Sequence, residues 1–155
     1  FRSATAAAIR PGETKLVWIE TPATPMWGIT DIAAAARLAH SADALLAVDS
    51  TVATPVLSQP IALGADIVMH SGTKFLDGQG RVMAGALCTT QALINDKLLP
   101  VMKNSGMVLS PFNAWVLSKS LETLDVRMER HAANAVWIAE QLQDHPKREV
   151  RCRDI

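Results

Sequence analysis

Apolar residues occur in short blocks along the first ninety positions, and polar or helix-forming stretches separate these blocks. Apolar runs without a polar residue at every second position are typical of parallel strands whose sheet is covered on both faces. We therefore expect an α/β fold with a mostly parallel sheet covered on both faces. Its strands are expected at 15–20, 45–49, 66–70 and 81–88.

Two helices are expected between the first three strands. The segment 30–42 has Thr30 as a candidate N-cap and Asp31 in the first turn, where a carboxylate interacts favourably with the helix dipole. A short helix is expected near 56–63, with Gly64 as its end.

After Ser110 the period of the apolar positions changes to three or four residues. Ser110 can cap a helix, and Pro111 suits the first helical position. The pattern predicts one long helix from about 111 to 144. Its apolar positions are Leu117, Leu121, Leu124, Met128, Ala132, Ala135, Ala139 and Leu142. The chain is thus divided into an α/β part over 1–110, a long helix over 111–145 and a tail over 146–155.

Composition mainly excludes classes of protein. The 155 residues carry 15 basic and 15 acidic side chains, which argues against a broad basic surface for nucleic acid or an anionic membrane. Cys88 and Cys152 are too few and too far apart for a disulfide framework or a CxxC metal site, and they suggest a reducing compartment. With neither an apolar run of transmembrane length nor a signal-peptide core, we expect a soluble, cytoplasmic protein.

Several other residues are first assigned ordinary structural roles. The four histidines have no metal-ligand spacing, so no metal site is expected. Met83 and Met128 are expected to fill the core. Asp77 and Arg81 are either substrate contacts or loop charges, the latter including charges at a subunit interface. The four tryptophans are expected to serve packing, and they are Trp18, Trp27, Trp115 and Trp137.

Polar side chains follow three of the expected strands. Asp49 ends one apolar run, the turn 71–74 follows the next, and the segment 20–22 follows the first. Ligands of open α/β sheets bind outside the carboxyl ends of the strands, so these groups converge if the strands are neighbours. The candidate site residues are therefore Asp49, Thr51, Ser71, Thr73 and Lys74.

The chemistry of these groups suggests one cofactor. A phosphate suits the hydroxyls and amides of the turn 71–73. A desolvated Lys74 amine could form a Schiff base with a carbonyl, and Asp49 could hold a protonated ring nitrogen. Pyridoxal phosphate requires these three functions together. Spacing alone leaves ordinary alternatives open, since Lys74 can be solvated, Asp49 can cap a loop and 71–73 can be a simple turn.

Four long segments carry a resemblance to one family, and they are ETPATP (20–25), TDIAAAARLAH (30–40), VDSTVATPVLSQPIALGADIVMHSGTKFLDGQGRVMAGALC (48–88) and SPFNAWVLSKSLETLDVRM (110–128). They resemble the pyridoxal-phosphate enzymes of cysteine and methionine metabolism. The resemblance implies a fold-type I, aminotransferase-like large domain, of which 1–110 is the second half. The helix 111–145 leads towards a C-terminal domain, so the chain is expected to be a partial domain.

The resemblance also implies residue roles. Lys74 matches the Schiff-base lysine and Asp49 the partner of the pyridine nitrogen. Ser71 and Thr73 match the phosphate-binding hydroxyls, and Thr51 matches a residue close to the ring. Thr24 departs from the family, which commonly has Asn at this position near the cofactor. Family members are longer, and their other segments supply a stacking aromatic ring and an arginine for the substrate carboxylate.

Within the family, FLDGQGRVMAGAL (75–87) and SPFNAWVLSKSLETL (110–124) resemble O-succinylhomoserine sulfhydrylases most. This implies a small amino-acid substrate, γ-replacement of succinate by sulfide to give homocysteine, and assembly into homodimers or homotetramers. A cystathionine γ-synthase, a γ-lyase and a catalytically silent piece remain alternatives. A nucleotide-binding domain is disfavoured, because the turn ETPATP after the first strand has no glycine.

Overall fold

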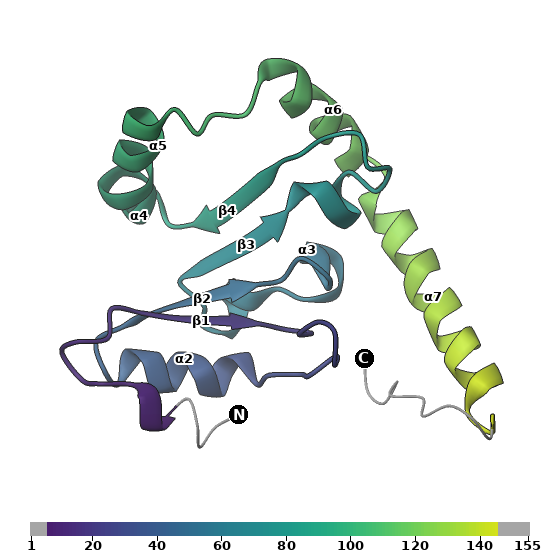
Figure 1. Cartoon of the computed structure of the whole chain (residues 1–155), viewed down its shortest axis with the longest axis horizontal. Coiled ribbons are helices and arrows are strands. Elements are labelled where there is room, and N and C mark those ends of the chain that lie inside the picture. Colours follow the sequence, from purple (N-terminus) through teal and green to yellow (C-terminus); the bar gives the residue numbers. More distant parts are fainter. Residues whose placement is uncertain (1–5, 146–155) are drawn as a thin grey trace.

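A four-stranded sheet forms the centre of the computed structural model, which describes residues 6–145 (Figure 1). The strands are β1 (Leu16–Glu20), β2 (Leu45–Asp49), β3 (Ile67–Ser71) and β4 (Gly85–Thr89), in the order β1-β2-β3-β4. The first three strands run parallel, and β4 is antiparallel to β3. The mostly parallel sheet is therefore confirmed. The tail 146–155, with Cys152, lies outside the described residues.

The helix α2 (Ile32–His40) covers one face of this sheet. Its N-cap is Asp31 rather than Thr30, because the Asp31 carboxylate accepts a hydrogen bond from the amide of Ala34 at 2.8 Å. The small side chains of its buried face allow a close approach to the strands. The resulting core consists of Val17, Ile19, Ile32, Ala35, Ala36, Ala39, Ala44, Leu46, Val48, Ala65 and Val68.

The expectation of a sheet covered on both faces holds at β2, where Leu46, Ala47 and Val48 are all 0% exposed, but it is wrong at β1. Along β1, Val17 and Ile19 are buried, whereas the alternate side chains Leu16 and Trp18 are 46% and 52% exposed. No helix in residues 6–145 packs on that face of β1, so these side chains meet solvent. β1 and β4 are the edge strands of the described sheet.

The connection between β2 and β3 contains two short helical turns instead of the single helix expected near 56–63. They are α3 (Thr54–Leu57) and η1 (Pro60–Leu63). The break precedes Pro60, whose ring disfavours helical backbone in the preceding residue. Gly64 ends the second turn with a φ of 99°, as predicted.

The segment after β4 is helical, which the sequence pattern did not indicate. It consists of α4 (Gln91–Leu93), η3 (Ile94–Leu98) and α5 (Leu99–Ser105). Its ends carry recognisable signals. The Thr90 side chain caps the first turn, and Gly106 adopts a φ of 69° after the last one.

The prediction of one long helix over 111–144 is wrong. The structure has α6 (Pro111–Leu121) and α7 (Leu124–Leu142), and α7 leaves α6 at an angle (Figure 1). The Ser120 carbonyl accepts hydrogen bonds from the Arg127 guanidinium at 2.9 Å and from the Thr123 hydroxyl at 3.2 Å. These side-chain donors satisfy a carbonyl at the end of α6, which favours ending the helix there. Ser110 caps α6 and Pro111 begins it, as predicted.

A second core joins α6 and α7 to the loop that follows β3. It consists of Leu76, Val82, Val116, Leu117, Leu124 and Met128. Met128 is 3% exposed, which confirms its expected role, whereas Met83 is 82% exposed and does not fill the core. The four tryptophans are each about half exposed, so their packing is at the surface rather than in the core; the rings of Trp115 and Phe112, for example, lie 6.0 Å apart. None of the helices described has the length and hydrophobicity needed to cross a membrane.

Candidate active site

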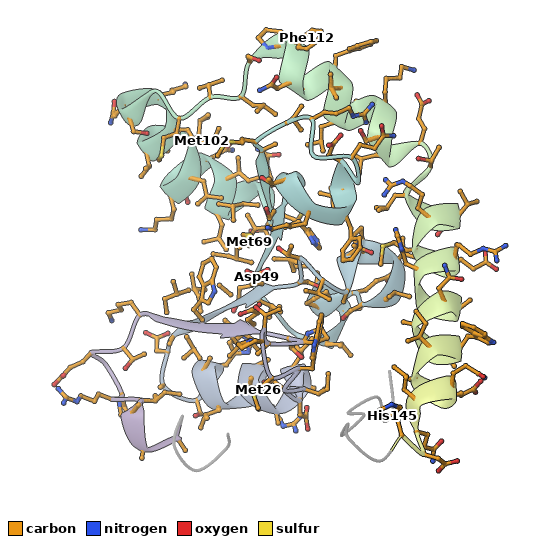
Figure 2. The ribbon with its side chains drawn as sticks, turned by 45° about the vertical axis from the view of Figure 1, so that its right-hand side comes forward. Met26, Asp49, Met69, Met102, Phe112 and His145 are labelled. Carbon is orange, nitrogen blue, oxygen red and sulfur yellow. The ribbon has the colours of Figure 1, made fainter. Side chains whose placement is uncertain are left out.

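The carboxyl ends of β1, β2 and β3 lie side by side. Glu20 pairs in register with Asp49, and Asp49 with Met69. A cavity of about 600 Å³ lies at this edge, and Asp49 is near the middle of the molecule in Figure 2. Its lining consists of Glu20, Thr24, Asp49, Thr51, Val52, Ser71, Thr73, Lys74, Phe75, Gly78, Gly80 and His131. All five candidate residues from the sequence therefore line one cavity.

The turn after β2 joins two strand ends. The Asp49 carboxylate accepts a hydrogen bond from the Thr51 amide at 2.9 Å through its Oδ1 atom. The Thr51 hydroxyl accepts one from the Ser71 amide at 2.8 Å. Asp49 therefore caps its own loop, as one alternative held, and it also lines the cavity. These bonds fix the end of β2 relative to the end of β3.

Lys74 lies in η2 (Gly72–Leu76), a helical turn closed by a bond of 3.2 Å from the Asp77 amide to the Gly72 carbonyl. The backbone of Lys74 departs from helical geometry, with φ −99° and ψ −127°. The Gly78 amide donates to the Lys74 carbonyl at 2.8 Å. A Cβ at Gly72 would lie 2.7 Å from the Cβ of Ala84, so only glycine fits at the start of this turn without a shift.

Several cavity groups lack an internal partner. Within residues 6–145, the Lys74 amine makes no ion pair, and the Ser71 and Thr73 hydroxyls make no hydrogen bond. The second oxygen of the Asp49 carboxylate is likewise without a protein donor in this range. An amine, two hydroxyls and a carboxylate oxygen are thus available to a ligand in one cavity. This donor set suits a ligand with an electrophilic carbon, an anionic group and a basic nitrogen.

Other cavity residues were not identified as site residues from the sequence. The Glu20 carboxylate accepts hydrogen bonds from the hydroxyl and amide of Thr24 at 3.2 and 3.4 Å. The His131 ring lies 5.4 Å from the Phe75 ring, centroid to centroid. The place of Glu20 at the end of a strand could have indicated it. His131 comes from α7, and no local pattern relates it to the strand ends.

His70 is buried beside the cavity rather than in its lining. Its Nδ1 atom lies 3.1 Å from the Ser50 carbonyl oxygen. Burial lowers the pKa of His70, and the Ser50 carbonyl and the Asp49 charge oppose this effect. The imidazole thus ties β3 to the turn after β2.

Asp77 and Arg81 form a structural network instead of lining the cavity. The Asp77 carboxylate is buried and accepts from the Arg81 guanidinium at 2.9 Å and from the Ser120 hydroxyl at 3.0 Å. The pKa of Asp77 is lowered to about 2, mainly by the hydrogen bond from the Arg81 amide; burial opposes this effect, and the Arg81 and Ser120 side chains add to it. Of the two roles left open, the structural one is therefore observed.

Three kinds of comparison place the chain among known proteins. The family model described as "Cys/Met metabolism PLP-dependent enzyme" matches residues 1–151, where PLP denotes pyridoxal phosphate. An O-succinylhomoserine sulfhydrylase of Pseudomonas aeruginosa is 46% identical over 90% of this chain and 34% of its own length. A cystathionine gamma-synthase of Mycobacterium bovis is 43% identical over 92% of this chain and 37% of its own length.

Solved structures agree with this placement. The crystal structure of metB from Corynebacterium glutamicum matches with a TM-score of 0.91 and 42% identity, over 96% of this chain and 38% of the other. Cystathionine gamma-lyase from Lactobacillus plantarum matches with a TM-score of 0.89 and 38% identity, over 94% and 38%. The chain spans about a third of the length of the curated relatives it matches. It belongs to the family of pyridoxal-phosphate-dependent enzymes of cysteine and methionine metabolism.

Proposed function

We propose that the cavity at the strand ends binds pyridoxal phosphate and that Lys74 is its covalent attachment point. The observation that carries this proposal is the Lys74 amine, which lines a cavity with Asp49 and has no carboxylate partner among the described residues. An amine that is not held in an ion pair is available to attack the carbonyl carbon of an aldehyde.

The other cavity groups have complementary roles in this proposal. The Ser71 and Thr73 hydroxyls would donate to the phosphate, together with backbone amides of the turn. The free oxygen of Asp49 would accept a hydrogen bond from the protonated ring nitrogen and so keep that nitrogen cationic. Thr51 would lie close to the ring, as the resemblance to the family implies, and its hydroxyl holds the Ser71 amide at 2.8 Å.

When bound, the cofactor withdraws electrons from the carbon atoms of the amino acid attached to it. Lys74 then acts as a base and an acid. Its Nζ atom takes a proton from the substrate Cα and moves protons at Cβ, so that a group on Cγ can leave. Asp49 keeps the ring nitrogen positively charged, and this positive charge favours the removal of the Cα proton.

We propose γ-replacement on O-succinylhomoserine as the reaction of the whole protein. Hydrogen sulfide supplies the new Cγ–S bond, the Cγ–O bond breaks, and the products are homocysteine and succinate. The sulfhydrylase of Pseudomonas aeruginosa, at 46% identity, supports this substrate pair. The cystathionine gamma-synthase, at 43% identity, supports a second candidate in which cysteine replaces sulfide. A γ-lyase activity, or a chain that binds the cofactor without turnover, remains a further alternative.

Covalent labelling tests the first part of the proposal. The protein is incubated with pyridoxal phosphate, reduced with borohydride and digested, and the labelled peptide is identified by mass. We expect label on Lys74 and its loss in Lys74→Ala, whereas Lys97→Ala, which alters an exposed lysine outside the cavity, retains it. Label that survives Lys74→Ala at the original yield would refute the assignment.

Product analysis tests the reaction. O-succinylhomoserine is supplied to the cofactor-loaded protein with sulfide, with cysteine or with neither. Homocysteine from the sulfide reaction supports the sulfhydrylase, cystathionine from the cysteine reaction supports the synthase, and turnover without either nucleophile indicates elimination. We expect Lys74→Ala to lower the rate by about 10²- to 10⁴-fold, which is the usual contribution of a positioned base.

We further propose a cytoplasmic homodimer or homotetramer acting on a small amino-acid substrate. The resemblance to the family supports this assembly, and a cavity of about 600 Å³ can hold a cofactor with a small amino acid. Sedimentation of the protein distinguishes these assemblies from a monomer, which would contradict the proposal.

A further inference from the structure

Arg127, in the first turn of α7, contacts two separate segments through one guanidinium group. Its Nη1 atom donates to the Phe75 carbonyl at 2.7 Å. Its Nη2 atom donates to the Ser120 carbonyl at 2.9 Å and to the Leu76 carbonyl at 3.3 Å, and its Nε atom donates to the Thr123 hydroxyl at 3.0 Å. Every nitrogen of the group therefore donates at least one hydrogen bond.

The acceptors of these bonds are chemically alike. Three are backbone carbonyls, and within the described residues Arg127 forms no ion pair with a carboxylate. Phe75 and Leu76 lie at the carboxyl end of η2, and Ser120 lies at that of α6. Carbonyls at helix ends lack intrahelical partners and carry partial negative charge, so a planar cation between two such ends satisfies both.

Gly78 gives Arg127 access to the segment after Lys74. A Cβ at Gly78 would collide with the Nη1 atom of Arg127, and the φ of 75° also favours glycine. The amide of Gly78 donates to the carbonyl of Lys74 itself at 2.8 Å. Arg127 thus packs against Gly78, whose amide binds the Lys74 carbonyl.

A second set of bonds, made through the Ser120 hydroxyl rather than its carbonyl, holds the end of the same loop. The Asp77 carboxylate accepts from the Arg81 guanidinium and from the Ser120 hydroxyl. This network uses side chains of the loop, whereas Arg127 binds the loop backbone next to Lys74. Removal of Arg127 therefore leaves the loop attached to α6 but frees the carbonyls immediately after the lysine.

We propose that Arg127 is a positioning residue for Lys74. It fixes the backbone 75–78 against the corner between α6 and α7, and thereby sets the direction from which the Lys74 amine enters the cavity. The inference rests on the proposed role of Lys74 and adds a residue that does not line the cavity. Because α7 carries Arg127, a displacement of α7 changes the position of the reactive amine.

Hydrogen exchange in the cofactor-free protein tests the structural half of the inference. In Arg127→Ala we expect the amides of Asp77 and Gly78 to exchange about tenfold faster, with the amides of β2 and β3 unchanged. Arg130→Ala is the matched control, because Arg130 is an exposed arginine of the same helix. Equal exchange in the two variants would overturn the inference.

Kinetics of the cofactor-loaded protein tests the functional half. We expect Arg127→Ala to lower kcat by about tenfold or more, to change KM less and to shift the pH profile of kcat, since Lys74 no longer has a fixed position. Arg127→Lys should recover part of the loss, because one ammonium can bind one of the two helix ends but not both. A pH profile and a kcat per folded molecule like those of Arg130→Ala would make Arg127 merely structural and would overturn the proposal.

A double-mutant cycle with Gly78→Ala covers the case in which Arg127→Ala folds poorly. Gly78→Ala alone should accelerate exchange at Asp77, because the added Cβ displaces the guanidinium. In the Arg127→Ala background the same change should add only the cost of its backbone conformation, so the two effects are less than additive. Additive effects would contradict the inference. If the unaltered protein fails to attach the cofactor at Lys74, the proposed function is refuted. The exchange results still show in that case whether Arg127 holds the loop.

Discussion

The replacement Asp77→Asn would test how strongly one buried carboxylate holds the loop after Lys74. Its Oδ2 atom accepts from the amides of Arg81 and Gln79 at 2.7 and 3.3 Å. Its Oδ1 atom accepts from the Arg81 Nε and Nη2 atoms at 3.1 and 2.9 Å and from the Ser120 hydroxyl at 3.0 Å. Asparagine offers one acceptor atom where aspartate offers two, so its amide nitrogen must face donors in either orientation.

The expected cost follows from the burial of this group. Asp77 is 1% exposed, so water cannot replace the lost acceptor. Removing one partner of a buried charged pair costs about 3 to 5 kcal/mol. Arg81 stays partly exposed and recovers some hydration, so we expect the lower end, about 3 kcal/mol. For a chain of this size this corresponds to a fall in Tm of about 10 °C.

The assay is urea denaturation followed by circular dichroism, with Asp144→Asn as control because Asp144 is exposed. The pH dependence provides a second readout. The pKa of Asp77 is lowered from 3.8 to about 2, so its contribution is complete above the ordinary pKa and is lost as the pH falls through the folded-state value. The difference between wild type and Asp77→Asn should therefore shrink between about pH 4 and pH 2.

A clear result would refute this reasoning. If Asp77→Asn changes the free energy of unfolding by no more than Asp144→Asn, within about 0.5 kcal/mol, the network does not hold the loop. A difference that persists undiminished at pH 2 would show that the charge of Asp77 is not the source of the stabilisation.

Two further substitutions probe the packing around the site. Gly72→Ala should destabilise the protein by about 1 to 3 kcal/mol, because the new Cβ would lie 2.7 Å from that of Ala84 and 3.1 Å from its backbone. The control is Gly28→Ala, which has open space around the added atom. Equal melting temperatures of the two variants would contradict the expectation. Met128→Ala should cost about 2 to 4 kcal/mol in a chemical denaturation, because it leaves a cavity in the second core, whereas Met83→Ala should change little at a site that is 82% exposed. A loss at position 83 as large as at 128 would argue against the assigned core.

The strand ends were predictable because their signals are local. β2 ends at Asp49, where an apolar run meets a charge, and β3 ends at Ser71, one residue beyond the predicted end. Parallel pairing of neighbouring strands then brings both ends to one edge, and this was sufficient to indicate the cavity residues that follow β2 and β3.

The remaining features depend on contacts between distant residues. The break between α6 and α7 was hidden by an unbroken apolar period, because the side chains of Arg127 and Thr123 that satisfy the Ser120 carbonyl leave no trace in that period. β4 runs antiparallel to β3 after the loop that contains Asp77, and strand propensity does not encode the direction of a strand. Burial of Met83 was misjudged because hydrophobicity indicates what can be buried, not what lies nearby to cover it.

Further strands can be added to the described sheet only at its two edges, β1 and β4. The outer rims of β1 and β4 each present backbone amides and carbonyls that another segment can pair with. The cavity, by contrast, lies where β1, β2 and β3 terminate, at right angles to the direction in which strands are added. Additional strands could therefore widen the molecule on either flank while the register of Asp49 with Met69, and hence the spacing of the reactive groups, is preserved.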